Sequence, residues 1–267
     1  EEILIVLTSV SLLLSIYSLP ISIAIAVLIF IVSFSYTQTI RAYPQGGGSY
    51  AVASENLGPK WGQVAGSSLL FAYVLTAAVS VSAGVAAITS AIPALYDYRV
   101  TLAIIFLVIV TIINLRGVKE SGTIFAIPTY FFVLSIGALI VVGLWRSFTG
   151  TLPVLNTVQA SAGLPAVSLF IVLRAFASGS TALTGVEAIS NGVPAFKKPE
   201  INNAIKTLWW MAALLAFLFV GITYLAFAVK VVPNPQETVI SQLARAVFGN
   251  GFMYFVVQVS TSLILLL

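Results

Sequence analysis

The chain has 267 residues, of which 60% are hydrophobic and only 7% are charged. A soluble domain carries roughly a quarter charged residues to cover its surface, so a soluble globular protein is excluded. Intrinsic disorder is excluded as well, because it requires low hydrophobicity and high charge. The composition therefore predicts an all-α integral membrane protein.

The chain contains no histidine and no cysteine. This excludes a His/Cys metal site, a Ser–His–Asp triad, a thiolate nucleophile and a disulfide framework. The net charge of +4 comes from bases that stand singly between apolar stretches, which is not the basic patch of a nucleic-acid-binding protein. We therefore expect no enzyme activity, no cofactor, no metal and no nucleic-acid partner.

Apolar segments follow one another along the whole chain. A membrane-spanning helix needs about 20 mostly apolar residues. Eight segments are candidates, of which the first and the last are incomplete: 3–14, 19–39, 62–92, 101–115, 123–145, 164–196, 205–229 and 252–267. Because the chain starts at Glu1 without Met and stops within an apolar run, we expect a piece of a longer transporter-like chain.

The distribution of Lys and Arg predicts the orientation in the membrane. If segment 3–14 runs outward, the inner loops carry seven bases and the outer loops carry four. Loops rich in Lys and Arg stay on the cytoplasmic side, so this orientation is favoured. It puts Gly46, Gly47 and Gly48 on the inner side, where they lack the Lys-Ser/Thr of a phosphate loop and are interpreted as a flexible turn.

Segment 164–196 gathers polar residues at membrane depth. Between Arg174 and Pro194 it contains three glycines and five hydroxyl side chains: Gly179, Gly185, Gly192, Ser178, Ser180, Thr181, Thr184 and Ser190. Apolar segments interrupted by glycine are typical of the discontinuous helices that bind solutes in transporters. A continuous helix whose small residues pack on a neighbour is the alternative. We predict a broken helix, interrupted between Ala175 and Thr181.

Glu187 is the only acidic residue well inside a predicted span. A carboxylate within the membrane is costly and indicates a functional site by default. Because desolvation disfavours the charged form of a carboxyl group, Glu187 is a candidate for proton binding. The alternative is a structural carboxylate paired with Arg174, which lies thirteen positions earlier, so that pairing requires the break to fold back.

A second group of hydroxyls lies in segment 62–92. Tyr73, Thr76 and Ser80 are spaced three and four residues apart and therefore share one helix face. Hydrogen bonds between packed helices explain such a stripe as well as solute binding does. If the stripe faces the broken helix, it forms a second wall of a solute site with Ser180, Thr181 and Thr184.

Four stretches carry a resemblance to a known family: RAYPQGGGSYAVASENLG, NLRGVKES, TALTGVEAISNGVPAFKKP and ETVISQLARAVFG. They resemble the amino acid–polyamine–organocation permease superfamily and, more narrowly, its bacterial potassium–proton symporter branch. The resemblance implies an inverted-repeat fold of five plus five helices in which the first and sixth helices are broken. Residues 1–267 would then form one transmembrane transporter domain, from the second half of helix 1 to part of helix 8.

The resemblance also implies roles for single residues. Hydroxyls corresponding to Tyr73, Thr76, Ser80 and Thr184 line the cation path in that branch, and the counterpart of Glu187 takes part in proton coupling. This chain departs from the branch at Ala72, where the branch has an aspartate, and at Ala86, a second acidic position. Without those carboxylates the dehydration of a bare cation is harder to offset.

These observations favour proton-coupled secondary transport of a small solute by alternating access across the plasma membrane. The cargo is left open between a potassium-like cation and an amino acid, whose carboxylate would bind N–H groups at a helix break. A channel, which would need a filter loop or rings of charge, and a membrane scaffold are the alternatives. The expected partners are the solute, protons and the lipid bilayer, and a homodimer is left open.

Overall fold

The computed structural model describes residues 2–8, 12–115, 122–155 and 168–266. All regular structure in these ranges is helical, because a helix satisfies its backbone polar groups internally where lipid offers no partner. The elements are α1 Glu2–Thr8, η1 Leu12–Tyr17, α2 Ser18–Ala42, α3 Gly48–Leu57, α4 Pro59–Ala91, η2 Pro93–Tyr98, α5 Arg99–Leu115, α6 Gly122–Phe148, α7 Leu169–Gly179, η3 Ser180–Leu183, α8 Val186–Asn191, η4 Val193–Ala195, α9 Glu200–Val229, α10 Val239–Phe248 and α11 Phe252–Leu266. Arg116, Lys119 and the start of segment 164–196 lie outside the described residues.

Six helical stretches in the described ranges are long and apolar enough to cross a membrane: Ser15–Ala42, Pro59–Ala91, Pro93–Ile112, Ala126–Phe148, Leu169–Asn191 and Glu200–Val229. Each overlaps one of the predicted apolar segments, so an all-α, multi-pass membrane protein is confirmed. In the described residues, the first predicted segment contains α1 and the start of η1, and the last contains the short helix α11. The predicted total of eight crossings is therefore not established by helix length.

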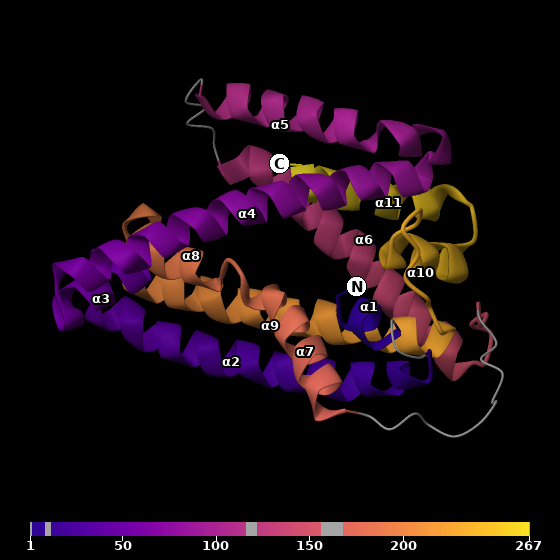
Figure 1. Ribbon diagram of the computed structural model, residues 1–267, viewed down its shortest axis with the longest axis horizontal. Helices are drawn as coiled ribbons and strands as arrows, with labels where there is room; N and C mark the ends of the chain where they lie inside the picture. The colour runs from indigo at the N-terminus through magenta and orange to yellow at the C-terminus, as the bar shows by residue number, and fades with distance from the viewer. Residues whose placement is uncertain (1, 9–11, 116–121, 156–167, 267) are drawn as a thin grey trace.

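The helices form two layers that lie on either side of the molecule (Figure 1). In one layer α2 packs along α9, and α7 and α8 lie beside them. In the other layer α4 packs on α11 and on α5. Helix α6 contacts both α9 and α11, and α3 contacts both α4 and α8, so these two helices connect the layers.

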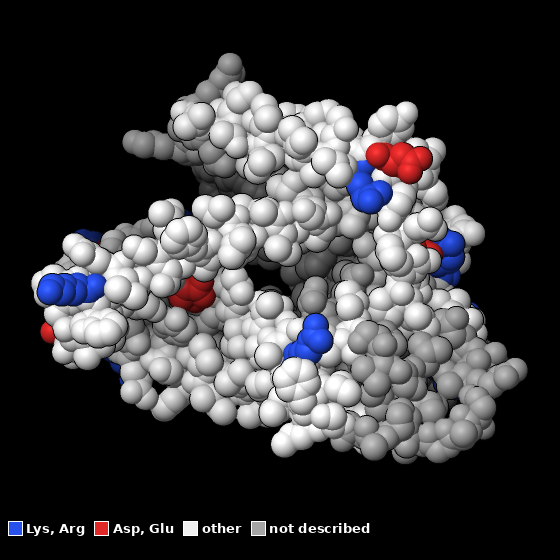
Figure 2. Space-filling view, viewed as in Figure 1, with Lys and Arg blue, Asp and Glu red and all other residues white. Residues whose placement is uncertain are grey.

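The main hydrophobic core lies where α6, α9, α10 and α11 meet. Its fully buried side chains include Ile136, Leu139, Leu225, Leu243 and Val257. Large apolar side chains elsewhere remain exposed, and none of the span Pro93–Ile112 is buried. Figure 2 shows few charged side chains on the viewed face, as a surface in contact with lipid requires.

The stretch Leu169–Asn191 is broken, but at a different place from the one predicted. The α-helix continues through Gly179, and the N–H of Ser180 still donates to the Phe176 carbonyl. Helical geometry ends at Thr184, which is extended, and at Gly185, whose φ is +97°. The predicted interval from Ala175 to Thr181 is therefore wrong, and the break lies at Thr184 and Gly185.

The side chains around the break explain its position. The hydroxyl of Ser180 donates to the Phe176 carbonyl at 2.8 Å, and that of Thr181 donates to the Ser178 carbonyl at 2.8 Å. Both residues remain helical, since they begin the 3-10 helix η3 that directly continues α7. The chain turns only at Gly185, because a left-handed backbone conformation costs glycine little and other residues much more.

Candidate functional site

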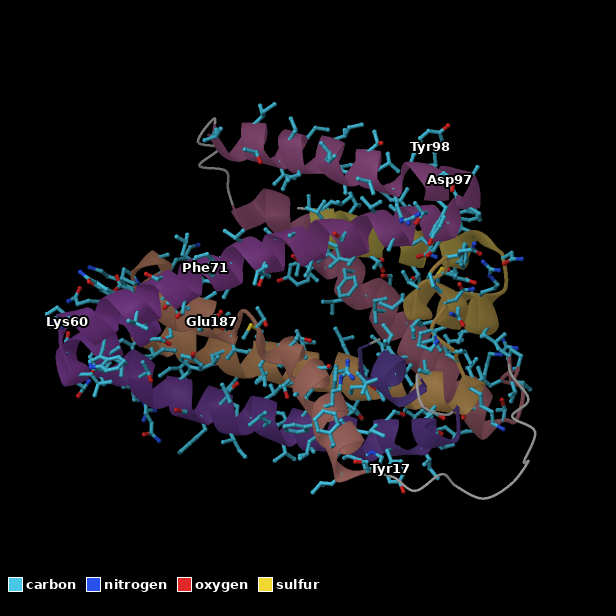
Figure 3. The ribbon with its side chains drawn as sticks, viewed as in Figure 1. Tyr17, Lys60, Phe71, Asp97, Tyr98 and Glu187 are labelled. Carbon is cyan, nitrogen blue, oxygen red and sulfur yellow. The ribbon has the colours of Figure 1, made fainter. Side chains whose placement is uncertain are left out.

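Glu187 lies in the first turn of α8, directly after the break, and is half-buried. Its Oε2 accepts a 3.1 Å hydrogen bond from the N–H of Gly185, so it satisfies one of the amide groups that the break frees. Figure 2 shows a hollow between the two helical layers with an acidic side chain at its rim, and Figure 3 labels Glu187 in that region. The carboxylate therefore stands where the interrupted helix meets the space between the layers.

The alternative pairing of Glu187 with Arg174 is not found. Within the described residues, the ion pair that forms joins Arg245 to Glu237 at 2.9 Å, far along the chain from α8. Arg174 is exposed on α7, on the other side of the break from Glu187. Within the described residues, Glu187 is thus a carboxylate in a candidate membrane span that forms no ion pair.

The other predicted residues of the broken segment differ in what their hydroxyls do. Ser180 and Thr181 bond to carbonyls of their own turn. Thr184 is exposed and sits in the extended backbone of the break, with its N–H donating to the Thr181 carbonyl at 3.0 Å. Of the three, only Thr184 lies at the break, where its side chain is exposed.

The hydroxyl stripe on α4 meets the broken segment at one residue. The hydroxyl of Tyr73 accepts a 2.7 Å hydrogen bond from Nδ2 of Asn191, at the end of α8. Thr76 is exposed and Ser80 is half-buried, and in the described ranges neither is hydrogen-bonded to α7, η3 or α8. The structure therefore brings Tyr73 to the broken segment, while solute binding by Thr76 and Ser80 stays a prediction.

Three further polar residues belong to this region and were not predicted. Tyr36, on α2, and Ser49, on α3, line the same cavity. Asn191 completes the group through Tyr73. The only sequence signal for Asn191 was its place in the stretch TALTGVEAISN, and a single tyrosine in a span gives no periodic pattern.

A cavity of about 470 Å³ adjoins this polar group between α2 and α3. Tyr36 and Ser49 line it together with other polar side chains: Ser35, Thr39 and Asn56. The cavity lies at the end of the molecule that carries the glycine turn, the side predicted to be inner. It gives the polar group at Glu187 a neighbouring space lined by hydroxyls.

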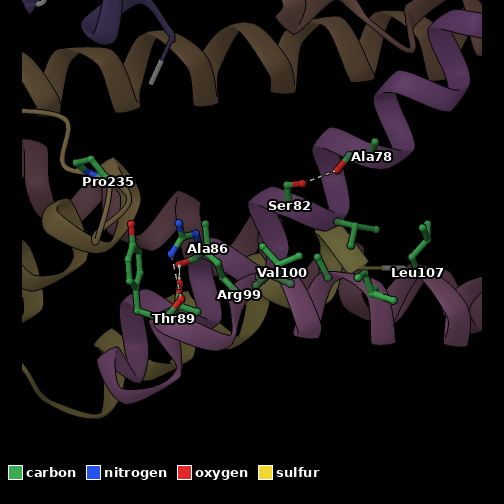
Figure 4. A pocket seen from close by; sticks show the side chains of 13 residues that line it. Ala78, Ser82, Ala86, Thr89, Arg99, Val100, Leu107 and Pro235 are labelled. Carbon is green, nitrogen blue, oxygen red and sulfur yellow. Dashed lines mark hydrogen bonds between the residues drawn. The ribbon is translucent and has the colours of Figure 1, made fainter.

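A second cavity, between α4 and α5, has different chemistry (Figure 4). Its hydroxyls are already engaged, since Ser82 donates to the Ala78 carbonyl at 2.8 Å and Thr89 donates to the Ala86 carbonyl at 3.2 Å. Arg99 stacks over the Tyr96 ring at 4.4 Å, and most other lining side chains are apolar. This groove has no carboxylate and lies apart from Glu187, so we do not regard it as the solute site.

Comparison with known proteins identifies the family. The family model for amino acid permeases matches residues 3–267, almost the whole chain. The chain belongs to the amino acid permease family. Its resemblance to the amino acid–polyamine–organocation superfamily is thereby confirmed. The family consists of transporters rather than enzymes.

Two curated relatives place this permease near the potassium-transporting branch. It is 51% identical over 271 residues to the potassium transporter KimA of Bacillus subtilis (strain 168), a match that covers 100% of this chain and 44% of KimA. It is 30% identical over 180 residues to the low affinity potassium transport system protein Kup of Pectobacterium atrosepticum, covering 66% of this chain and 27% of Kup. The permease chain thus spans less than half the length of these relatives.

Proposed function

We propose that this permease is a proton-coupled secondary transporter that moves a small solute across the plasma membrane by alternating access. One observation carries the proposal. The broken span places the half-buried carboxylate of Glu187 directly after the left-handed Gly185, in the region between the two helical layers (Figure 3). Interrupted helices of this kind are where secondary transporters hold their solute, because freed backbone groups and nearby side chains replace water.

The proton role of Glu187 rests on its place in the fold. It is a carboxylate within a candidate membrane span, and within the described residues it forms no ion pair. Its Oε2 accepts from the N–H of Gly185 at the break, so a change in the geometry of the break changes the contacts of the carboxylate. We infer that Glu187 exchanges its proton as the break changes shape during the transport cycle.

The proposal includes the architecture implied by the family. In it, α1 is the second half of helix 1, the pair α7 and α8 is the broken sixth helix, and α11 is part of helix 8 of a five-plus-five inverted repeat. The two short terminal helices would then bring the number of membrane segments to eight. The shared length with KimA, 44% of that relative, leaves room for the remaining helices in such a repeat.

A potassium-like cation is the cargo that the comparisons favour, because KimA is a potassium transporter and Kup is a low affinity potassium transport system protein. The oxygens that would replace its hydration shell come from Tyr73, Thr76, Ser80, Ser180, Thr181 and Thr184. An amino acid is the second candidate. It is favoured by Ala72 and Ala86, which supply no counter-charge for a cation.

Uptake by proteoliposomes that contain the complete protein tests the proposal. Under an imposed pH gradient, acidic outside, rubidium as a potassium tracer should accumulate above its equilibrium level, and a protonophore should abolish that accumulation. Accumulation of labelled amino acids without accumulation of rubidium would show that the cargo is an amino acid and not a cation. Rubidium flux that only equilibrates would indicate a channel, and no flux of either solute would indicate a scaffold.

A further inference from the structure

Asn191, the last residue of α8, is held by two other parts of the molecule. Its Nδ2 donates to the Tyr73 hydroxyl on α4 at 2.7 Å, and its main-chain carbonyl accepts from the N–H of Gly47 at 3.3 Å. Its side-chain carbonyl Oδ1 is buried and has no hydrogen-bond donor. One residue therefore ties the inner half of the broken span both to the hydroxyl stripe and to the turn between α2 and α3.

The turn formed by Gly46, Gly47 and Gly48 is shaped to receive Asn191. All three glycines have left-handed φ values, of +80°, +85° and +42°. A Cβ on Gly46 would lie 2.5 Å from the Asn191 main-chain oxygen, and one on Gly48 would lie 2.0 Å from Oδ1. Side chains are therefore excluded at these two positions. The turn packs closely against Asn191 and is not the flexible connection that the three glycines suggested.

The hydrogen bond to Tyr73 uses an oxygen that the proposed cation path needs. A phenol oxygen that accepts from Asn191 has one lone pair fewer for a cation, and the positive end of the N–H dipole points toward the same oxygen. Cation binding at Tyr73 and the bond from Asn191 therefore oppose each other. The unpartnered Oδ1 adds a cost to the closed arrangement, which makes the contact reversible.

We propose that Asn191 is a positioning residue that closes the inner end of the solute path. It holds Tyr73 and the glycine turn against α8 while Tyr73 carries no cargo, and it releases both when cargo binds and the path opens inward. The inference rests on the proposed function and on the predicted orientation, which puts the glycine turn on the inner side. It adds a trigger: the cargo competes with Asn191 for one oxygen atom.

Cysteine labelling tests this inference, because the chain has no thiol of its own. The reporter is T184C in the complete protein. Inverted vesicles expose the cytoplasmic face of the protein to the medium, and a membrane-impermeant maleimide added to that medium labels the cysteine from the inner side. Asn191→Ala removes the side chain, and Gly48→Ala disturbs its seat without changing Asn191 or Tyr73. Each should raise the inner-side labelling rate about fivefold, the ratio expected when one hydrogen bond is lost.

Two controls separate this effect from general loosening. Gly150→Ala introduces alanine at another left-handed glycine, of φ +69°, where an added Cβ meets nothing within 4 Å, so the labelling rate should not change. Tyr73→Phe should raise the rate as Asn191→Ala does, and the double variant should show no further increase. Saturating potassium should raise the rate in the parent and have little effect in Asn191→Ala.

Equal labelling rates in the parent, Asn191→Ala and Gly48→Ala would overturn the role of Asn191. If T184C still reacts from water in that case, the proposed function stands without the closing contact. If T184C reacts from neither side in any protein, no solute path passes the break, and both proposals fail. Additive effects of Asn191→Ala and Tyr73→Phe would also overturn the inference, because the two residues would then act independently.

Discussion

The hydroxyl of Tyr73 and the side-chain amide of Asn191 form a 2.7 Å hydrogen bond although the residues are 118 positions apart. The bond joins α4, which carries the hydroxyl stripe, to α8, the second half of the broken span. It gives the two groups of polar residues a direct connection in the fold.

Glu187→Gln should abolish proton-driven accumulation and leave solute binding in place. Glutamine has the shape of the protonated carboxyl group and can neither take up nor release a proton. Uptake into proteoliposomes under an imposed pH gradient measures the accumulation, and equilibrium binding of the solute is the control. A variant that concentrates solute as well as the parent would make Glu187 a structural residue.

Cysteines at the stripe should react with aqueous reagents. Y73C, T76C and S80C are expected to react with a membrane-impermeant maleimide in lipid vesicles. Phe71 is 69% exposed on the same helix, so F71C is the matched lipid-facing control and should react only with membrane-soluble reagents. If all three stripe positions react only from the lipid phase, the solute site does not include the stripe and lies elsewhere.

Gly185→Ala should lower stability through its backbone alone. An added Cβ meets nothing within 4 Å, but φ is +97°, so we expect a loss of about 1–2 kcal/mol from strain. Gly137→Ala is the control, since its Cβ also meets nothing within 4 Å and its φ is helical, and it should be neutral or stabilising. Thermal unfolding in lipid nanodiscs compares the two variants. Equal stabilities would mean that the turn at Gly185 is not required.

Ala72→Asp should increase the apparent affinity for a cation. Ala72 precedes Tyr73 and is half-buried on α4, so an aspartate there would add a counter-charge beside the proposed path. We expect KM for rubidium uptake to fall about tenfold, which corresponds to 1.4 kcal/mol. Ala78→Asp, at an exposed position on the opposite face of the same helix, controls for a change of charge alone. An unchanged KM would favour the amino acid as cargo.

The broken span shows how far the sequence could predict this site. The glycines, hydroxyls and Glu187 correctly indicated an interrupted helix, but they could not tell which glycine makes the turn. Gly179 is helical and allows close packing, since a Cβ there would lie 2.6 Å from Ile25 and 2.7 Å from Ile3. Gly185 instead adopts a left-handed φ, which makes the turn. Both functions require glycine, so composition alone cannot separate them.

The contact between Tyr73 and Asn191 could not be predicted from the sequence, for another reason. Helical periodicity reports which residues share a face of one helix, and it correctly grouped Tyr73 with Thr76 and Ser80. It does not report which distant residue meets that face. Asn191 reaches Tyr73 only because the chain turns at Gly185 and ends α8 beside the glycine turn.

The two halves of the broken span share α2 as a neighbour but otherwise pack on different helices. Helix α7 packs on α1 and α2, whereas α8 packs on α3 and α9 as well as α2. Between them, Thr184 and Gly185 are the residues that leave helical geometry. A displacement of α1 therefore reaches α7 without having to shift α8, and a displacement of α3 reaches α8 first. In the proposed transport cycle, each half of the span could therefore move with its own neighbours while the other half stays in place.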